Sequence, residues 1–521
     1  MNNIQNFKAA FVGAKLPFFA FAGSLAAYYG FAPAYGGGNP AQVLLPAMLL
    51  LTTVLSLLCV LDSLRISGID ERCIKKMFIA GIFFTAGFAL GIACRGAANY
   101  SYYLFPGLET DNIVAVSGKL IDDPRNTASG RGMALLNLNA SHGKRGLRVS
   151  ARGKVMVFFP EGSIPRLKEF GRGSEIYIEG NFIKTDASSH SKTPMFRARS
   201  VHVTHPPPRF EQWRTGIRLA LIDVFSPGDA TGRGRDWGGL ALALLLGIRD
   251  NLDGELSEQY RNAGCSYILA LSGMHLAIVS SIIAFFLKKP LGLKKAALIG
   301  MLFILLYVFL VGAQPSLTRA AIMYVLGAIA IICAFPVNPA LLLGFSFIIQ
   351  IFVQPDSGDT VSFILSYLAL AGILSLGQGA AGLFRGYVPE FAGSSLSASL
   401  GAFLATMSVS IVFFGSLRPI GIAAGLVMVP LTTVFMIGAM AYLPLHLLAP
   451  QLTPLPALLL GRGLELVYRI LERIVSFAGR FPNILFSNVI FSTIVLIVVP
   501  IIILYVCKIM HIKRLYLEKF A

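Results

Sequence analysis

The stretch from Ser266 to Leu287, SYILALSGMHLAIVSSIIAFFL, decides the fold class. It contains no Asp, Glu, Lys or Arg, and its length matches the ~20 apolar residues that an α-helix needs to cross a bilayer. Similar apolar stretches recur along the chain, at residues 16–32, 43–61, 77–94, 294–311, 317–335, 360–376, 400–414 and 483–507. This pattern predicts a polytopic α-helical membrane protein.

The composition excludes an ordinary soluble enzyme. Of the 521 residues, 55% are apolar and 13% are charged, which is more apolar surface than a water-soluble fold of this length buries. A shorter apolar stretch lies at 340–353, and a long one at 419–449 contains Pro430. We therefore expect about 10–12 spans. The six cysteines are scattered, without the close pairs typical of a disulfide framework or a metal site.

Short basic loops predict the orientation, because cytoplasmic loops retain Lys and Arg. Lys8 and Lys15 place the N-terminus inside, and the loops at 65–76 and 288–295 belong on the same side. The polar block between the third and fourth spans then lies outside the cytoplasm. The basic tail at 508–514 should also lie inside, which requires an even number of spans and favours splitting the long proline-containing stretch in two.

Residues 112–209 differ from their flanks, because apolar and polar side chains alternate and are separated by Gly, Asp-Pro and Ser. Such alternation predicts half-buried strands. The strands are expected at 113–120, 133–138, 147–159, 175–182 and 201–204. Five short strands with a glycine in the first suit a small closed barrel such as an OB-fold. We therefore predict an inserted, extracytoplasmic, OB-like β-barrel.

The predicted barrel is strongly basic. From Asn112 to Gln212 the sequence has sixteen Lys and Arg against eight Asp and Glu, a net charge of +8. The candidate DNA-binding side chains are Lys144, Arg145, Arg148, Arg152, Lys154 and Phe158, with Phe159, Tyr177 and Phe182 as further aromatic side chains available for stacking. Barrels of this type bind single strands through a basic groove and aromatic side chains. Contact with lipid headgroups explains the same charges, and both interpretations stay open.

The chain divides into five parts. They are N-terminal transmembrane helices at 1–99, the OB-like domain at 100–209, a linker at 210–264, a transmembrane domain at 265–507 and a basic cytoplasmic tail at 508–521. Three consecutive prolines, Pro206–Pro208, end the barrel as a stiff connection. Residues 210–225 follow as an amphipathic helix that we expect on the membrane surface.

Four motifs follow one another in the second half of the chain. They are SYILALSGMHLAIV at 266–279, preceded by ALLLG at 243–247; PSLTRAAIM at 315–323; SFILSYLA at 362–369; and FGS at 414–416 with VPL at 429–431. In sequence and order they resemble the ComEC-type competence family, and the upstream spans and basic block resemble that family's N-terminal region. Tyr267 departs from the pattern, since the family often has His there, and residues 425–428 replace its usual Asn-Leu.

The resemblance implies an inner-membrane channel that passes single-stranded DNA into the cytoplasm during natural transformation. The implied partners are single-stranded DNA, the lipid bilayer, an extracytoplasmic DNA receptor, a cytoplasmic helicase-type motor, a separate nuclease and further copies of the chain. The sequence has no GxxxxGK[ST] motif. It stops at Ala521 without the metallo-β-lactamase-like domain of longer family members, and its histidines form no HxHxDH-like cluster. We therefore expect no enzymatic activity, no cofactor and no metal site.

The candidate translocation path consists of Ser272, Gly273, His275, Arg319 and Ser366. On a helix, Ser272 and His275 would share one face, and Gly273 would let another backbone approach. A polar face inside an apolar span points to a partner helix or to a water-filled path, and both roles stay open. A Ser–His nucleophile lacks a carboxylate nearby in sequence. Two other functions also stay open: a solute or ion permease with its substrate site at Ser272 and His275, and a non-transporting assembly partner.

Arg319 is the only Lys or Arg between Lys295 and Arg385. A cation near the start of a helix opposes the helix macrodipole and loses its hydration in the membrane, so it needs a compensating group. The candidates are a phosphate of the transported strand, an ion pair with Asp356 or Asp359, and extension of the side chain to the membrane interface.

Overall fold

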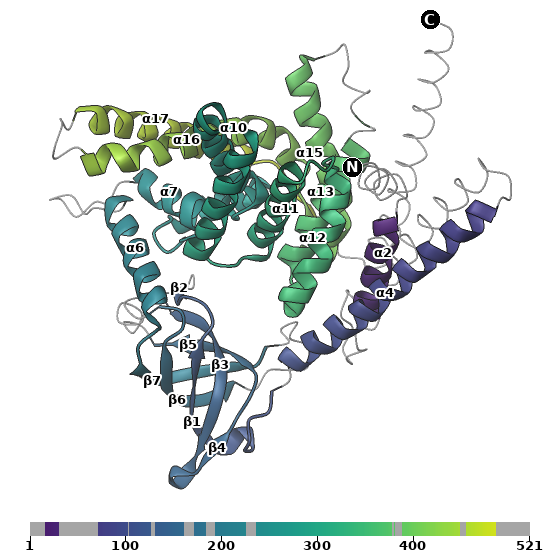
Figure 1. Cartoon of the computed structure of the whole chain (residues 1–521). Helices are drawn as coiled ribbons and strands as arrows, with labels where there is room; N and C mark the ends of the chain where they lie inside the picture. The colour runs from purple at the N-terminus through teal and green to yellow at the C-terminus, as the bar shows by residue number, and fades with distance from the viewer. Residues whose placement is uncertain are drawn as a thin grey trace, which may run out of the picture.

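The computed structural model describes residues 16–30, 71–102, 104–126, 131–160, 171–183, 193–225, 236–377, 380, 388–448 and 455–485. Figure 1 shows a body of helices above a β-sheet domain, with helices α4 (Glu71–Tyr102) and α6 (Arg209–Phe225) running between them. The predicted span at 43–61, most of the one at 483–507 and the basic tail lie outside the described residues.

The helices follow most of the predicted apolar stretches. Before the sheet domain, α2 (Leu16–Gly30) packs on α4 so closely that a Cβ added at Gly87 would clash with the Ala20 carbonyl oxygen. After α6 come α7 (Asp236–Leu246), α8 (Gly254–Asn262), α9 (Ser266–Leu269), α10 (Gly273–Val311), α11 (Pro315–Ile332), α12 (Pro339–Val353), the turn η3 (Pro355–Asp359), α13 (Val361–Gly372), its continuation η4 (Ile373–Gly377), α15 (Glu390–Phe414), β8 (Ser416–Leu417), α16 (Ile420–Leu448), α17 (Leu455–Ala478) and β9 (Ile484–Leu485).

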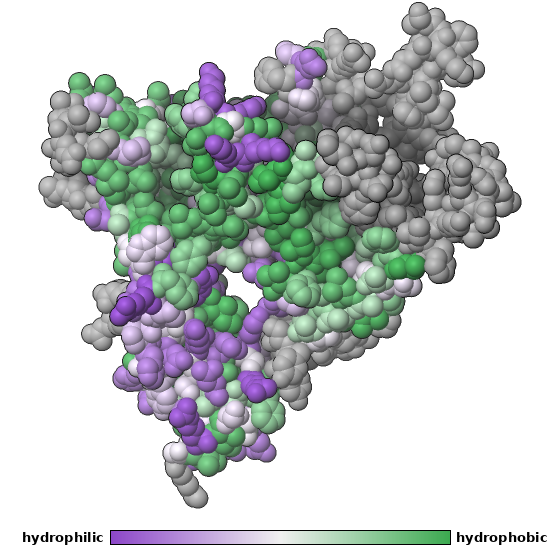
Figure 2. All heavy atoms as spheres, viewed as in Figure 1, coloured by the Kyte–Doolittle hydropathy of each residue, from purple (hydrophilic) through white to green (hydrophobic). Residues whose placement is uncertain are grey.

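Among the described residues, five helices are long and apolar enough to cross a membrane: α4, α10, α11, α15 and α16. Helices α7, α12 and α13 are apolar but shorter. Leu302 and Phe303 of α10 are 58% and 52% exposed, and Figure 2 shows hydrophobic residues over much of the helical body, whereas the sheet domain is largely hydrophilic. Apolar surface of this extent fits contact with lipid. The prediction of a helical membrane protein is confirmed, and the count of ten to twelve spans stays a prediction.

Helix α10 contains the two spans predicted at 266–287 and 294–311. The start of the first differs from the prediction, because α9 ends at Leu269 and α10 begins only at Gly273. The two spans are separate helical legs joined at a kink at Gly292, where φ is +77°. Only glycine adopts this backbone conformation at little cost. Because Gly273 and Val311 both lie near the start of α11, α10 consists of two legs that reverse at Gly292.

Helix α16 corrects a second prediction, the division of 419–449 at Pro430. The helix runs without interruption from Ile420 to Leu448 and contains both Pro430 and Pro444. Prolines are tolerated in membrane helices where neighbouring helices and hydroxyl side chains compensate for the freed backbone groups. Helix α16 packs against α17, a helix that the apolar stretches did not predict. The buried stripe of α17 consists of Ala457, Leu464, Tyr468, Leu471, Val475 and Ala478, largely at the spacing of three and four that marks an amphipathic helix.

The sheet domain has seven strands: β1 (Ile113–Leu120), β2 (Arg125–Asn126), β3 (Gly132–Gly143), β4 (Arg148–Ser150), β5 (Lys154–Phe159), β6 (Glu175–Ile183) and β7 (Met195–His205). Strand β1 pairs with both β6 and β3, so the pairings β1–β6–β7–β5–β3 return to β1 and close a ring of five strands. Neighbours in the ring are antiparallel except β5 and β7, which are parallel. Val116, Leu136, Val155 and Ile176 are fully buried inside. The predicted β-domain is confirmed, because alternating side chains supply its core.

Candidate functional site

Ser272 and His275 cap the start of α10. Ser272 Oγ accepts a hydrogen bond from the backbone N–H of Met274 (3.3 Å), and the Ser272 N–H donates to His275 Nδ1 (3.0 Å). The chain is non-helical between α9 and α10, and the first N–H groups of α10 need such acceptors. The hydrogen bonds of this pair therefore lie within one element and not between helices. His275 is fully buried, and its Nε2 has no hydrogen-bond partner among the described residues.

Arg319 lies near the start of α11 and contacts two other helices. Its Nη1 donates to the carbonyl oxygen of Ser366 on α13, and its guanidinium lies 5.7 Å from the ring centre of Tyr367. A Cβ added at Gly273, the first residue of α10, would come within 3.3 Å of Arg319 Nη2. Three helices therefore meet around a cation that is only 8% exposed.

A polar network fixes the helices around this cation. Ser316 Oγ and Ser366 Oγ are 3.0 Å apart. The Tyr367 hydroxyl donates to Gln350 Oε1 (3.0 Å), and Gln350 Nε2 donates to the carbonyl oxygen of Pro315 (2.9 Å). Hydrogen bonds in a low dielectric are strong when complete and costly when broken. The network therefore fixes the start of α11 against α12 and α13.

The structure brings Gly273, Arg319 and Ser366 together, and places Ser272 and His275 beside them as the cap of α10. Arg319 Nε, like His275 Nε2, has no partner among the described residues. A buried polar group without a partner costs about 1–3 kcal/mol, so water or a ligand atom is the expected partner of each. Chemically, the cluster offers a fixed positive charge and N–H donors to an anion.

The carboxylates proposed as partners of Arg319 are engaged elsewhere. Asp359 Oδ1 accepts a 2.6 Å bond from Arg95 Nη1 of α4, and Asp356 pairs with Lys154 of β5. Both acids lie on η3, where α4 and the sheet domain reach them. The predicted ion pair of Arg319 with either acid is therefore wrong. Extension of Arg319 to the interface is also wrong, because its side chain is buried between helices.

The predicted basic face of the sheet domain is only partly available. The exposed basic side chains are Lys144, Arg148 and Arg152. The side chain of Arg145 lies outside the described part, and Phe158 is half-buried. Phe159 was predicted as a stacking partner, but it is 1% exposed, because the strand alternation points it into the core. Lys154 is held by Asp356, so it joins the sheet domain to the helices.

An ion-pair cluster at the junction of sheet domain and helices was not predicted. Arg214 of α6 is 1% exposed; its Nη2 donates to Asp123 Oδ2 (2.7 Å), and its Nε donates to the carbonyl oxygen of Phe309 (2.8 Å). Arg218 Nη1 donates to the carbonyl oxygens of Leu310 (3.0 Å) and Val311 (2.9 Å). Two cations of α6 therefore satisfy the free carbonyls at the end of α10, where the helix dipole favours positive charge.

Two acids complete this cluster. Glu211 Oε1 accepts a 2.6 Å bond from Arg172 Nη2, and Asp123 also accepts from the Arg172 backbone N–H (2.9 Å). Burial alone would raise the pKa of Asp123, but the hydrogen bond from Arg214 and the charge of Arg218 lower it to about 2. The sequence does carry a signal for this cluster: Glu211, Arg214 and Arg218 are three and four residues apart, which places them on one face of α6. The position of this helix on the membrane surface stays a prediction.

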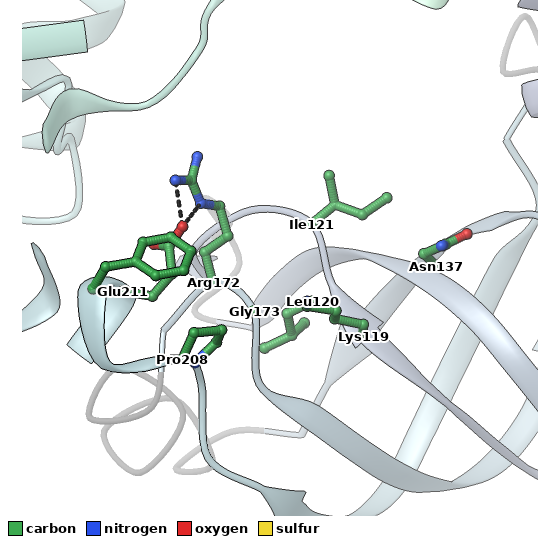
Figure 3. Close-up of a pocket in the computed structure, with 9 residues that line it drawn as sticks. Lys119, Leu120, Ile121, Asn137, Arg172, Gly173, Pro208 and Glu211 are labelled. Atoms are coloured by element: carbon green, nitrogen blue, oxygen red, sulfur yellow. Dashed lines mark hydrogen bonds and ion pairs between the residues drawn. The ribbon is translucent and has the colours of Figure 1, made fainter. Parts of the chain in front are cut away.

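A pocket of about 290 Å³ lies beside this cluster. It is lined by Lys119, Leu120, Ile121, Asn137, Arg172, Gly173, Pro208, Phe210 and Glu211. Figure 3 shows Lys119 and Asn137 toward one end and the Arg172–Glu211 pair with Pro208 toward the other. No group of three or more His, Cys, Asp or Glu in the described part of the chain is arranged to hold a metal ion.

Comparison with protein families matches residues 244–512, more than half of the chain, to the family described as Competence protein. The chain belongs to this ComEC-type competence family. ComE operon protein 3 of Bacillus subtilis (strain 168) is 28% identical over 184 residues, which are 33% of this chain and 22% of that protein. An uncharacterized protein of Aquifex aeolicus (strain VF5) is 26% identical over 271 residues, 52% of this chain and 61% of that protein. Less than two thirds of either relative is therefore covered.

The competence-family match confirms the resemblance seen in the four motifs. It begins in α7 and includes α10, α11 and α13, which meet at Arg319. The sheet domain and α6 precede the matched residues. The predicted path residues therefore lie inside the part that this chain shares with the competence family, whereas the pocket and the ion-pair cluster lie mainly outside it.

Proposed function

We propose that this competence-family protein carries single-stranded DNA across the bacterial inner membrane during natural transformation. The observation that carries the proposal is Arg319, a buried cation between α10, α11 and α13 with no carboxylate partner among the described residues. A phosphate that crosses a low-dielectric region needs a fixed positive charge, and Arg keeps its charge at any physiological pH. The competence match supports a role in DNA uptake, and the name of the Bacillus relative points the same way.

The sheet domain supports a nucleic-acid cargo over a small solute. We infer that the ring of β1, β3, β5, β7 and β6 is an OB-like barrel, since a five-stranded closed Greek-key ring is the form of that fold. Its exposed Lys144, Arg148 and Arg152 suit the sugar-phosphate backbone of a single strand. A permease for a small solute has no need of such a domain beside its site.

We also propose that the barrel lies outside the cytoplasm. Arg214 and Arg218 join α6, which follows the barrel, to the end of α10, and the exposed Lys288 and Lys295 lie at the reversal of α10, at its opposite end. Cytoplasmic loops retain Lys, so the barrel and the lysine-bearing reversal belong on opposite sides of the membrane.

Cysteine labelling tests this orientation. In a variant without the native cysteines, Leu147→Cys on the barrel should react with a membrane-impermeant maleimide in intact spheroplasts, because Leu147 is 55% exposed. Lys288→Cys should react only after the membrane is opened, and Ser141→Cys serves as the unreactive control, because Ser141 is fully buried. Labelling of Lys288→Cys in intact spheroplasts, without labelling of Leu147→Cys, would invert the orientation.

We assign no catalytic role to this chain. The pulling force and the degradation of the second strand would come from a helicase-type motor and a separate nuclease. The direct test of the function is a deletion strain supplied with labelled DNA. Nuclease-protected label in the cytoplasm should fall to background and return on complementation. Protected DNA at the parental level would refute the proposal, whereas normal DNA uptake with loss of a solute flux would identify a permease.

A further inference from the structure

The pocket beside α6 includes two polar side chains that take no part in the ion-pair cluster. Lys119 of β1 and Asn137 of β3 stand directly opposite each other in the antiparallel register, so their side chains lie on the same face. Both are exposed, and neither has a hydrogen bond or ion pair among the described residues. One end of the pocket therefore offers an unpaired cation and a free amide.

The other end of the pocket is aromatic and electrically neutral. Phe210 is 58% exposed, although its ring lies against Phe309 with 6.1 Å between the centroids. Arg172 and Glu211 form an ion pair at 2.6 Å, so their charges compensate each other. Gly173, which also lines the pocket, has a φ of +91°, which favours glycine, and contributes no side chain to it. An exposed ring held in place at the pocket is suited to stacking.

We propose that this pocket binds one nucleotide of single-stranded DNA, with the base stacked on Phe210 and the adjacent phosphate bound by Lys119. The Asn137 amide can donate to and accept from the sugar or the base edge. The volume of about 290 Å³ is just below the range of small-molecule pockets, about 300–1,000 Å³, and so fits a monomer unit rather than a run of bases. A lipid headgroup would need the cation but not the exposed ring.

The position of the pocket gives it a role within the proposed function, on which this inference rests. Phe210 contacts Phe309, two residues before the end of α10. The chain then turns through Gly312 and enters α11, which carries Arg319. A strand that leaves the basic face of the barrel would meet this nucleotide site before it reaches the buried cation.

The test uses the full chain in phosphatidylcholine nanodiscs and two fluorescent probes, a (dT)₂₀ strand and the same strand with abasic sugars, read by anisotropy. Phe210→Leu should weaken (dT)₂₀ binding about tenfold, since stacking contributes about 1–3 kcal/mol per base, and leave abasic binding unchanged. Lys119→Gln should weaken both probes and reduce the salt slope by about 0.7. The matched controls are Trp213→Leu, an exposed aromatic of α6 outside the pocket, and Arg199→Gln, an exposed cation of β7.

The outcomes separate this site from the proposed function. Parental affinity for both probes in Phe210→Leu and Lys119→Gln would overturn the nucleotide site, while the parental chain still binds (dT)₂₀. An equal loss of affinity in the control variants would show that DNA binds through general surface charge or stacking and not through this pocket. Inhibition by phosphatidylglycerol in the nanodiscs, with no difference between the two probes, would identify a lipid site. Absence of (dT)₂₀ binding by the parental chain at any salt concentration would count against the proposed function itself.

Discussion

Arg319→Gln is expected to abolish DNA uptake while normal amounts of the protein remain in the membrane. The substitution removes the buried cation that faces Ser366 and Gly273. An uncompensated charge at the centre of a bilayer costs about 3 kcal/mol, which corresponds to about a 100-fold fall in the rate of phosphate passage. Nuclease-protected, labelled DNA measures the effect, and membrane immunoblots measure the protein.

Three further variants define what this result means. Arg319→Lys should keep part of the uptake, because it retains the charge but not the planar geometry of the guanidinium. His275→Gln should keep most of it, because the cap of α10 needs an acceptor and not a charge. Arg469→Gln is the control, since Arg469 is an exposed cation of α17 that pairs with Glu465 (2.7 Å) on its own helix. Loss of the Arg319→Gln protein from the membrane would contradict a role in the path and indicate a structural one.

Asp123→Asn is expected to destabilise the attachment of the sheet domain to the helices. Asp123 is the acid that faces both Arg214 and Arg218. Removal of one partner from a buried ion pair costs about 3–5 kcal/mol, because the other charges stay buried. Thermal unfolding of the purified full chain, followed by the fluorescence of Trp213 in α6 after replacement of the second tryptophan, Trp237, should show a clearly lower Tm.

The matched control is Glu258→Gln, which breaks the exposed 2.9 Å pair with Arg261 and should change the free energy of unfolding by less than about 1 kcal/mol.

The pH dependence of stability provides a second readout for Asp123→Asn. The pKa of Asp123 is lowered to about 2 in the folded protein, against about 3.9 when unfolded, so its stabilising effect is complete above pH 4 and disappears as the pH falls toward 2. Asp123→Asn should lose this part of the acid sensitivity. Equal Tm values for the two variants would refute the role of Asp123.

The sequence was sufficient where one physical signal dominated. Long apolar runs predicted the membrane helices, and strict alternation predicted strands such as β1 and β6, because burial alone determines both patterns. It failed where two signals competed. Pro430 was expected to divide a helix, but an apolar environment with packed neighbours keeps α16 continuous. The reversal of α10 at Gly292, by contrast, falls within the loop that the flanking lysines predicted.

The candidate site shows the same limit. The motifs identified Gly273, Arg319 and Ser366, and the structure joins them, although they lie far apart in sequence. The partner of each charge was not predictable, because it depends on which helices meet. Asp356 and Asp359 were candidate partners of Arg319, yet they bind Lys154 and Arg95 from elements more than 200 residues earlier.

The turn η3 connects the sheet domain with the helices. Its Asp356 pairs with Lys154 of the sheet domain and its Asp359 with Arg95 of α4, and Tyr29 of α2 donates to the carbonyl oxygen of Gly358 (2.9 Å). The next residue, Thr360, caps α13, the helix that holds Ser366 against Arg319. The carbonyl that positions the buried cation is therefore linked through one short turn to the sheet domain, α2 and α4, so a change in how the sheet domain contacts η3 is expected to alter the position of α13.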